Sequence, residues 1–209
     1  MDEMIVTNKS LLACLNELLS TSTIKDYCPN GLQVEGKTTV KKVITGVTAS
    51  EALIDAAIES GADAILVHHG YFWKGENQTI TGLKKNRISK LIKNDINLFA
   101  YHLPIDVHSE FGNNVQLAKL LNIVNIKPIE SVSPVGVLMQ GQFEQPLSCS
   151  ELTNVIESNL ARMPLVSDVR NTDIKTVAWC TGGGQGYIDI ADEVGIDAFI
   201  TGEASEQTI

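Results

Sequence analysis

The chain has 209 residues, of which 44% are hydrophobic and 20% are charged, and its net charge at pH 7 is −9. A chain of this length can bury a sizeable core in one or two domains, and the composition is typical of a soluble globular protein. The acidic balance disfavours general binding to nucleic acid or to an anionic membrane surface.

Two further features of the sequence bear on location. The acidic start, residues 1–4, differs from a secretory signal, and no apolar run approaches the length that spans a membrane. The four cysteines lie far apart and form no CxxC pair; they are Cys14, Cys28, Cys149 and Cys180. We therefore expect buried, reduced thiols and a cytoplasmic protein.

The first predicted elements alternate between helix and strand. Thr7 or Asn8 is expected to cap a helix with leucines along one face. The sequence Pro-Asn-Gly at 29–31 predicts a turn before a short strand. Residues 43–47 predict a buried strand, after which Ser50 is expected to cap a helix that ends at Gly61.

The functional interpretation depends most on residues 62–70, an apolar run that ends in His68, His69 and Gly70. Such a run favours a strand buried on both faces of a parallel sheet, where ligands bind beyond the carboxyl ends of the strands. Neighbouring strand side chains point to opposite faces, so both imidazoles can serve one site only where the strand ends and the chain turns. By themselves, His68 and His69 are equally consistent with a metal site and with strand-end histidines that only make hydrogen bonds.

Two stretches after the histidines have both a structural and a functional interpretation. Aromatic residues at 71–73 beside Lys74 could stack a base and meet a phosphate, but such clusters more often pack on the core or on another subunit. A basic helix is predicted over 84–93, where a solvated face is the usual interpretation and recruitment of anions is the alternative.

The strand predicted over 96–101 also ends in a histidine. Pro104 cannot extend a central strand, so Asp106 is predicted to lie in a loop at the sheet edge that carries His68 and His69. A carboxylate with histidines is a ligand set for Zn, Mn, Fe or Ni. His102 is either a further ligand or a residue that orients the ligands.

The second half of the chain begins with a helix that Asn113 or Asn114 is expected to cap. Residues 126–172 contain several prolines, a strand predicted over 135–143 and a helix predicted over 150–161, and we interpret them as a small α/β excursion without catalytic residues. The remaining predicted elements are a strand over 177–181, a helix over 187–194 and a strand over 197–201.

The loop after residues 177–181 is rich in glycine. Its backbone N–H groups could hold an anion, which makes Gly182, Gly183 and Gly184 candidate substrate-binding residues. It lacks the Gly-Lys-Ser/Thr of a P-loop, and Asp189 stands where the GxGxxG pattern needs its third glycine. A tight turn between a strand and a helix explains the loop about as well.

An internal repeat relates the two ends of the chain. A shift of 134 residues gives seven identities in eleven positions. The residues Ile54, Asp55, Ala57, Glu59, Gly61, Asp63 and Ala64 fall on Ile188, Asp189, Ala191, Glu193, Gly195, Asp197 and Ala198. The repeat predicts two related βαβ halves, and because Glu203 falls on His69 it becomes a candidate ligand or catalytic base.

These observations predict an α/β fold in three parts. Residues 1–125 form an N-terminal half that carries the histidines and Asp106, residues 126–172 form the excursion, and residues 173–209 form a C-terminal half.

The ordered motifs resemble those of the NIF-three-like dinuclear metal-centre proteins, commonly called GTP cyclohydrolase 1 type 2 homologues, and the bacterial type in particular. The motifs are residues 26–36, 67–73, 102–106, 112–114 and 201–203. The resemblance implies a three-layer α/β sandwich with a mostly parallel central sheet, assembly into a toroidal homohexamer, and two divalent metal ions per subunit. On that analogy His68, His69 and Asp106 match metal ligands of the family.

The resemblance also implies a departure at the end of the sequence. Family members continue past the position of Ile209 with a helix, a strand and a segment that supplies one more histidine and one glutamate ligand. This chain would therefore carry three of five expected ligands, and we expect weaker metal binding and fewer bound ions.

Two functions follow as hypotheses. The first is a metal-dependent hydrolase of a nucleotide-like small molecule, in which cations lower the pKa of a bound water and the glycine-rich loop and basic helix hold an anionic group. The second is a non-enzymatic metal-binding scaffold that contacts a partner through the aromatic residues 71–73.

Overall fold

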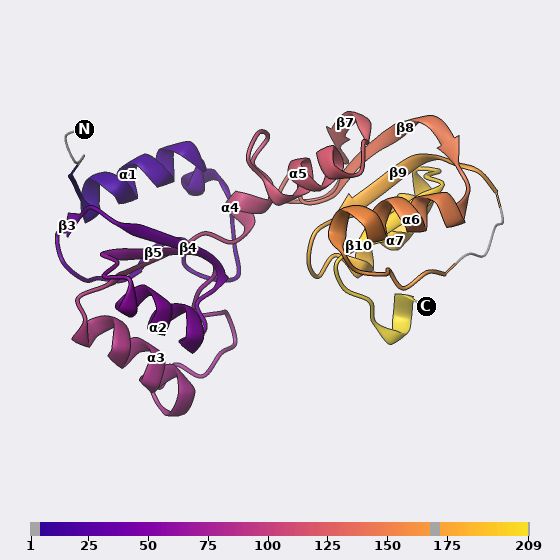
Figure 1. Ribbon diagram of the computed structural model, residues 1–209. Helices are drawn as coiled ribbons and strands as arrows, with labels where there is room; N and C mark the ends of the chain where they lie inside the picture. Colours follow the sequence, from indigo (N-terminus) through magenta and orange to yellow (C-terminus); the bar gives the residue numbers. More distant parts are fainter. Residues whose placement is uncertain (1–4, 168–171, 209) are drawn as a thin grey trace. The chain divides into compact units, whose positions relative to one another are not determined.

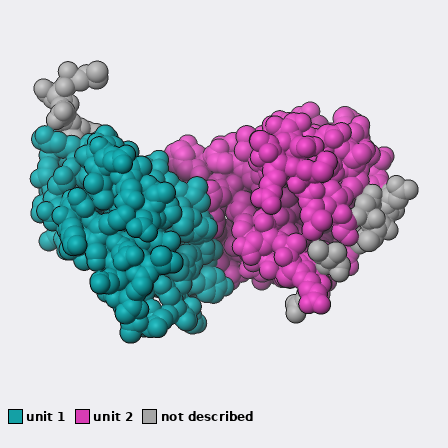
Figure 2. Space-filling view, turned by 60° about the horizontal axis from the view of Figure 1, so that its bottom comes forward, with its two compact units in different colours: residues 1–105 teal, residues 106–209 magenta. Residues whose placement is uncertain are grey.

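The computed structural model describes residues 5–167 and 172–208. The acidic start, a few residues of the predicted excursion and residue 209 lie outside the described residues. The chain divides into two compact units, Met1–Ile105 and Asp106–Ile209 (Figure 2). Each unit contains its own four-stranded sheet with helices packed against it, so each is described by itself.

The sheet of the first unit places the ends of two parallel strands side by side. Its strand order is β2 (Gly31–Val34), β6 (Asn97–Ala100), β5 (Ala64–His69) and β4 (Val43–Thr48). Strands β4, β5 and β6 run parallel, and β2 runs antiparallel to β6. A separate two-stranded ladder pairs β1 (Val6–Thr7) with β3 (Thr39–Val40). The carboxyl ends of β5 and β6 therefore meet at one edge of the sheet.

Helices cover both faces of this sheet (Figure 1). Helix α1 (Asn8–Leu18) packs on one face, where Ala64 and Leu66 contribute to the core, and α2 (Glu51–Glu59) and α3 (Gly82–Lys93) pack on the other, where Ile65 and Val67 do. This alternation explains the uninterrupted apolar run of β5, because both of its faces are buried. The first unit therefore has three layers.

Local chemistry sets the helix ends as predicted. The Thr7 hydroxyl accepts a hydrogen bond from the Ser10 N–H at the start of α1, and the Ser50 hydroxyl accepts one from the Leu53 N–H at the start of α2. Gly61 follows α2 with a φ of +67°, a backbone conformation that glycine adopts without strain. A short 3₁₀ turn, Thr21–Thr23, follows α1.

Two local predictions in the first half are wrong. Strand β4 is not buried: it is an edge strand, and Val43 and Val47 are 39% and 69% exposed, because β5 and β6 take the central positions. Asp106 does not lie in a loop but ends a short helix, α4 (Leu103–Asp106). Pro104 is compatible with that helix because residues of a first turn need no N–H partner within the helix.

The sheet of the second unit is mixed. Its strand order is β10 (Ala198–Thr201), β9 (Ile174–Cys180), β8 (Met139–Leu147) and β7 (Val124–Pro128), with β9 and β10 parallel and the other neighbours antiparallel. Its helices are α5 (Asn113–Leu120), α6 (Cys149–Leu160) and α7 (Ile188–Glu193), with 3₁₀ turns at Gln185–Tyr187 and Glu206–Thr208. Trp179 is fully buried in the core that the sheet forms with α5 and α6.

The predicted part boundaries at residues 125 and 172 differ from this division, which falls after Ile105. Strand β8 belongs to the predicted excursion, yet it pairs with β9, with Met139 opposite Trp179. Leu152 of α6 packs in the same core. Strands β7 and β8 therefore complete the second sheet, because the two-stranded β9–β10 ladder alone could not bury the faces of its side chains.

The predicted asparagine cap of α5 is also wrong. The N-cap residue is Gly112, with no side-chain hydrogen bond. The Asn113 amide donates instead to Asp106, and the buried Asn114 amide donates to the carbonyls of Gly136 and Val137. Asn113 thus contacts the end of α4, and Asn114 holds the loop at residues 136–137, so neither side chain caps α5.

The two βαβ segments predicted by the repeat are present and share one register. Val43 lies opposite Ala64 in the first sheet, and Val177 lies opposite Ala198 in the second, a shift of 134 residues for each pair. The parallel strands, the intervening helix and the glycine after it recur in both segments. The α/β class is thereby confirmed. Among the described residues, no helix combines the length and apolar character that crossing a membrane requires.

Candidate metal centre

Three imidazoles gather at the carboxyl edge of the first sheet. His68 and His69 are the last residues of β5, and His102 lies two residues after the end of β6. The ring centre of His68 lies 4.4 Å from that of His69 and 5.0 Å from that of His102. Each ring offers one ligand atom, and these atoms all lie within 4.8 Å of one another.

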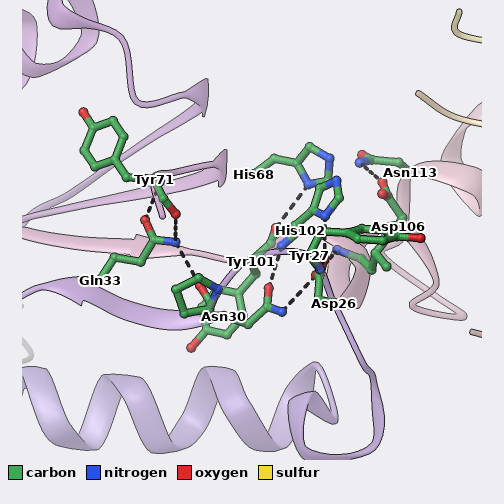
Figure 3. Close-up of polar contacts among 12 residues, drawn as sticks. Asp26, Tyr27, Asn30, Gln33, His68, Tyr71, Tyr101, His102, Asp106 and Asn113 are labelled. Atoms are coloured by element: carbon green, nitrogen blue, oxygen red, sulfur yellow. Dashed lines mark hydrogen bonds and ion pairs between the residues drawn. The ribbon is translucent and has the colours of Figure 1, made fainter. Parts of the chain in front are cut away.

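Hydrogen bonds set the tautomers of two of these rings (Figure 3). The Nδ1 of His68 lies 3.1 Å from the Tyr101 carbonyl, and the Nδ1 of His102 lies 2.8 Å from a carboxylate oxygen of Asp26. A carbonyl and a carboxylate only accept, so both Nδ1 atoms carry the proton and the lone pair of each ring is on Nε2. The Nδ1 of His69 lies 3.4 Å from the Thr48 hydroxyl.

This donor set fits a divalent transition metal. Imidazole nitrogens are ligands of Zn, Fe, Ni and Mn, and a ligating histidine usually donates its other N–H to a carbonyl or a carboxylate. Nitrogens around a tetrahedral zinc lie about 3.4 Å apart. The ligand atoms of the three rings, within 4.8 Å of one another, lie near that spacing.

Asp26 is the functional residue that the sequence interpretation missed. Its side chain is 2% exposed and accepts hydrogen bonds from His102 Nδ1, Asn30 Nδ2 and the N–H groups of Tyr27 and Leu103. Burial alone raises the pKa of Asp26, but these hydrogen bonds bring the pKa below its ordinary value. The sequence showed only a turn here, and the carboxylate just before that turn was the available signal.

A second group of ligand-type atoms is formed by Asp26, Cys28 and His102. It is poorly suited to a metal. Burial, and then the charge of Asp26, raise the pKa of the Cys28 thiol to about 12, whereas a thiol must lose its proton to ligate. The carboxylate of Asp26 already accepts four hydrogen bonds.

The aromatic loop packs inward, as the more common interpretation predicts. Tyr71 is buried, and its hydroxyl donates to the Ala49 carbonyl. Lys84 of the basic helix lies over the Phe72 ring, 4.9 Å from its centre. The Trp73 ring packs edge-on against His102, with centres 4.8 Å apart, and 5.9 Å from His69. Trp73 thus covers part of the histidine cluster.

Asp106 lies in the second unit, where its side chain is buried. One carboxylate oxygen accepts a hydrogen bond from Asn113 at 2.7 Å and lies 3.5 Å from the Thr181 hydroxyl. Asp106 also lines a mostly apolar cavity of about 380 Å³ that Val115, Ile126 and Met139 share. The structure thus brings together His68, His69 and His102 within one unit, while Asp106 as a ligand stays a prediction.

The glycine-rich loop is explained by close packing within the second unit. A side chain at Gly184 would clash with the Cys180 sulfur, and one at Gly202 would lie 2.6 Å from the Gly182 nitrogen. A Cβ at Gly183 would lie 3.3 Å from the Glu203 carboxylate, whose charge opposes an anion at that position. Anion binding by this loop and a catalytic role for Glu203 stay predictions.

Residues 6–209 match the sequence profile of the Duf34/NIF3 (NGG1p interacting factor 3) family. The chain belongs to the NIF3 family. Among related NIF3-family proteins, a GTP cyclohydrolase 1 type 2 homolog of Haemophilus influenzae is 56% identical over 205 residues, which cover 98% of this chain and 81% of the relative.

Two solved structures share the fold. One, described as protein ybgI of unknown function, is 53% identical with a TM-score of 0.93, and the match covers 98% of this chain and 81% of that one. A Thermus thermophilus protein is 34% identical with a TM-score of 0.84, and the match covers 97% and 80% of the two chains. The NIF3 assignment thus confirms the resemblance seen in the motifs.

Proposed function

We propose that this NIF3-family chain is a metal-dependent hydrolase that acts on a nucleotide-like small molecule. The observation that carries the proposal is the cluster of His68, His69 and His102, with ligand atoms within 4.8 Å of one another. The name of the relatives, GTP cyclohydrolase 1 type 2 homolog, supports a nucleotide-like substrate. The name is an analogy at the level of the family, so the chemistry must be tested at the site itself.

Divalent cations bound there would supply Lewis acidity and lower the pKa of water close to neutrality. The residues of the chain would orient the ligands: Tyr101 holds the His68 ring and Asp26 holds the His102 ring by their Nδ1 protons. The Trp73 ring would exclude bulk water from one side of the imidazoles. Excluding water strengthens the electrostatic interactions of a site.

The proposed cofactor is a pair of divalent cations, with Asp106 as the carboxylate ligand beside His68 and His69. The donor set accepts Zn, Mn, Fe or Ni. We further propose a cytoplasmic homohexamer, which sedimentation velocity can test by the mass of the assembly.

The function is tested by incubating the metal-loaded protein with GTP and a panel of other nucleotides and separating the products by chromatography. We expect turnover that chelation abolishes and that His68→Ala lowers at least a hundredfold. Lys9→Ala serves as a matched surface control, since Lys9 is exposed and lies at the start of α1, outside the basic helix. Equal turnover by the original protein and by His68→Ala would remove the hydrolase proposal.

The alternative function is a metal-binding scaffold that recognises a partner through residues 71–73. Tyr71 is buried and Trp73 packs on His102, so their rings leave little aromatic surface for a partner to contact. Metal binding without turnover on any tested nucleotide, together with a partner captured by the original protein and lost from Trp73→Ala, would favour the scaffold.

A further inference from the structure

We propose that His102 is a metal ligand alongside His68 and His69, and that Asp26 and Asn30 are the positioning residues that aim its ring. The inference rests on the proposed metal-binding function and assigns a role within it. Nothing in the motifs of the sequence separates His102 as a ligand from His102 as a supporting residue.

The segment 26–30 holds His102 at both the backbone and the ring. The Asn30 side-chain oxygen accepts a hydrogen bond from the His102 N–H at 2.8 Å, and one Asp26 oxygen accepts one from the His102 ring, also at 2.8 Å (Figure 3). The other Asp26 oxygen accepts hydrogen bonds from Leu103 N and from Asn30 Nδ2. The two side chains that fix His102 thus also fix each other.

The hydrogen bonds of Asp26 and Asn30 to His102 go beyond those required to form the turn at residues 26–30. The Asp26 side chain is 2% exposed, and a buried carboxylate is costly unless its hydrogen bonds and charge are put to use. A carboxylate that accepts Nδ1–H leaves the lone pair on Nε2 and fixes the orientation of the ring, which is the way proteins prepare a histidine as a ligand. The ring is only 16% exposed and packs among His68, His69 and Trp73.

The test measures zinc affinity by competition with a chromophoric chelator, on the whole chain and four variants. We expect His102→Ala to lower zinc affinity more than Asp26→Asn, which should lower it about 10- to 100-fold. The double variant should bind no more weakly than His102→Ala alone, because Asp26 acts through that ring.

A matched control separates positioning from general stability. Asp63 is also a buried carboxylate of the first unit, and it accepts from the N–H groups of Lys41 and Lys42 far along the chain from His102. Asp63→Asn should lower the thermal midpoint but leave zinc affinity unchanged. Circular dichroism of every variant confirms that affinity is compared among folded proteins.

A second readout needs no metal. In ¹⁵N-histidine spectra of metal-free protein, the His102 ring should show the Nδ1–H tautomer, and Asp26→Asn should shift it toward a mixture of tautomers. Zinc should then shift the Nε2 signal of His102 together with those of His68 and His69.

Three outcomes would overturn the inference. They are unchanged zinc affinity in His102→Ala, a zinc-insensitive His102 Nε2 signal, or an Asp26→Asn effect that persists in full when His102 is already alanine. If the original protein binds no zinc at all, the proposed function fails instead, and the two failures are therefore distinguishable.

Discussion

The two βαβ segments of this chain share a frame but end differently. In the first, Asp63 accepts hydrogen bonds from the N–H groups of Lys41 and Lys42 at the start of β4. In the second, Asp197 accepts them from Lys175 and Thr176 at the start of β9. All three positions are related by the same shift of 134 residues, so the repeat extends to individual hydrogen bonds.

The difference lies at the opposite end of the strands. His68 and His69 end β5, whereas Gly202 and Glu203 follow β10 at the corresponding positions. The first segment places two imidazoles where parallel strands end, beside His102, and the second uses the same place for a glycine that packs on Gly182. The shared aspartate hydrogen bonds thus lie at the amino ends of the strands. The residues that differ between the segments lie at the carboxyl ends, where ligands bind in such sheets.

The largest expected effect separates His69 from its counterpart Glu203. His69→Ala should lower zinc affinity at least a hundredfold, because it removes an imidazole from the cluster, while Glu203→Ala should change it less than threefold. Isothermal titration with zinc measures both. Equal losses of zinc affinity would mean that both residues serve one metal centre. A loss of turnover in Glu203→Gln with unchanged zinc affinity would make Glu203 a base.

Asp63 and Asp197, the aspartates that accept these N–H groups, should differ in their contribution to stability. Asp63→Ala is expected to cost about 2–3 kcal/mol, since it removes a buried carboxylate that accepts from the N–H groups of Lys41 and Lys42 and pairs with Lys37. Asp197→Ala, at an exposed position, should cost about 1 kcal/mol. Hydrogen exchange of the amides in β4 and β9 reports each unit separately. A larger loss for Asp197→Ala would contradict the comparison.

The two segments also differ at the start of the helix that follows their first strand. Ser50 caps α2, and its counterpart is Gly184, which precedes α7 without a side-chain cap. Ser50→Ala should cost about 1 kcal/mol. Gly184→Ser should not add a cap but destabilise the second unit, because its Cβ would clash with Cys180. Chemical denaturation of both variants tests this, and a stabilised Gly184→Ser would refute it.

The smallest expected effect concerns pH. Burial raises the pKa of Asp63, but the Lys37 side chain and the N–H groups of Lys41 and Lys42 outweigh burial and lower the pKa below its ordinary value. The ionised carboxylate therefore stabilises the first unit above about pH 4, and this contribution is lost as pH falls through the lowered pKa of the folded state.

The measurement is the urea midpoint followed from pH 6 to pH 3. Asp63→Asn should show a shallower decline below about pH 4 than the original protein, because asparagine has no proton to take up. Identical slopes for the two proteins would show that Asp63 contributes nothing to the acid sensitivity of the fold.

Much of this comparison could be predicted from the sequence. Periodicity and caps located α1, α2 and β5, since Thr7, Ser50 and the apolar run act locally. The repeat predicted both βαβ segments, because related sequences carry the same register. The exposure of β4 could not be predicted, because an edge strand and a central strand differ only in which neighbours the chain supplies.

The site was predictable in part for a related reason. Adjacent histidines at the end of an apolar run mark a sheet edge, and the sequence located that edge correctly. The contribution of Asp26 depends on β6 bringing His102 back to the turn at residues 26–30, a pairing between residues 76 positions apart. The role of Asn114 in holding Gly136, rather than capping α5, likewise depends on tertiary contacts.

The central claim is that His68, His69 and His102 are ligands of the proposed divalent cations. Anomalous diffraction at the zinc edge, from crystals grown with zinc, tests it most directly. The account predicts an anomalous peak about 2.0–2.1 Å from the Nε2 atom of each of these three rings. Rings that point apart with no peak between them, in crystals that take up zinc elsewhere, would contradict it.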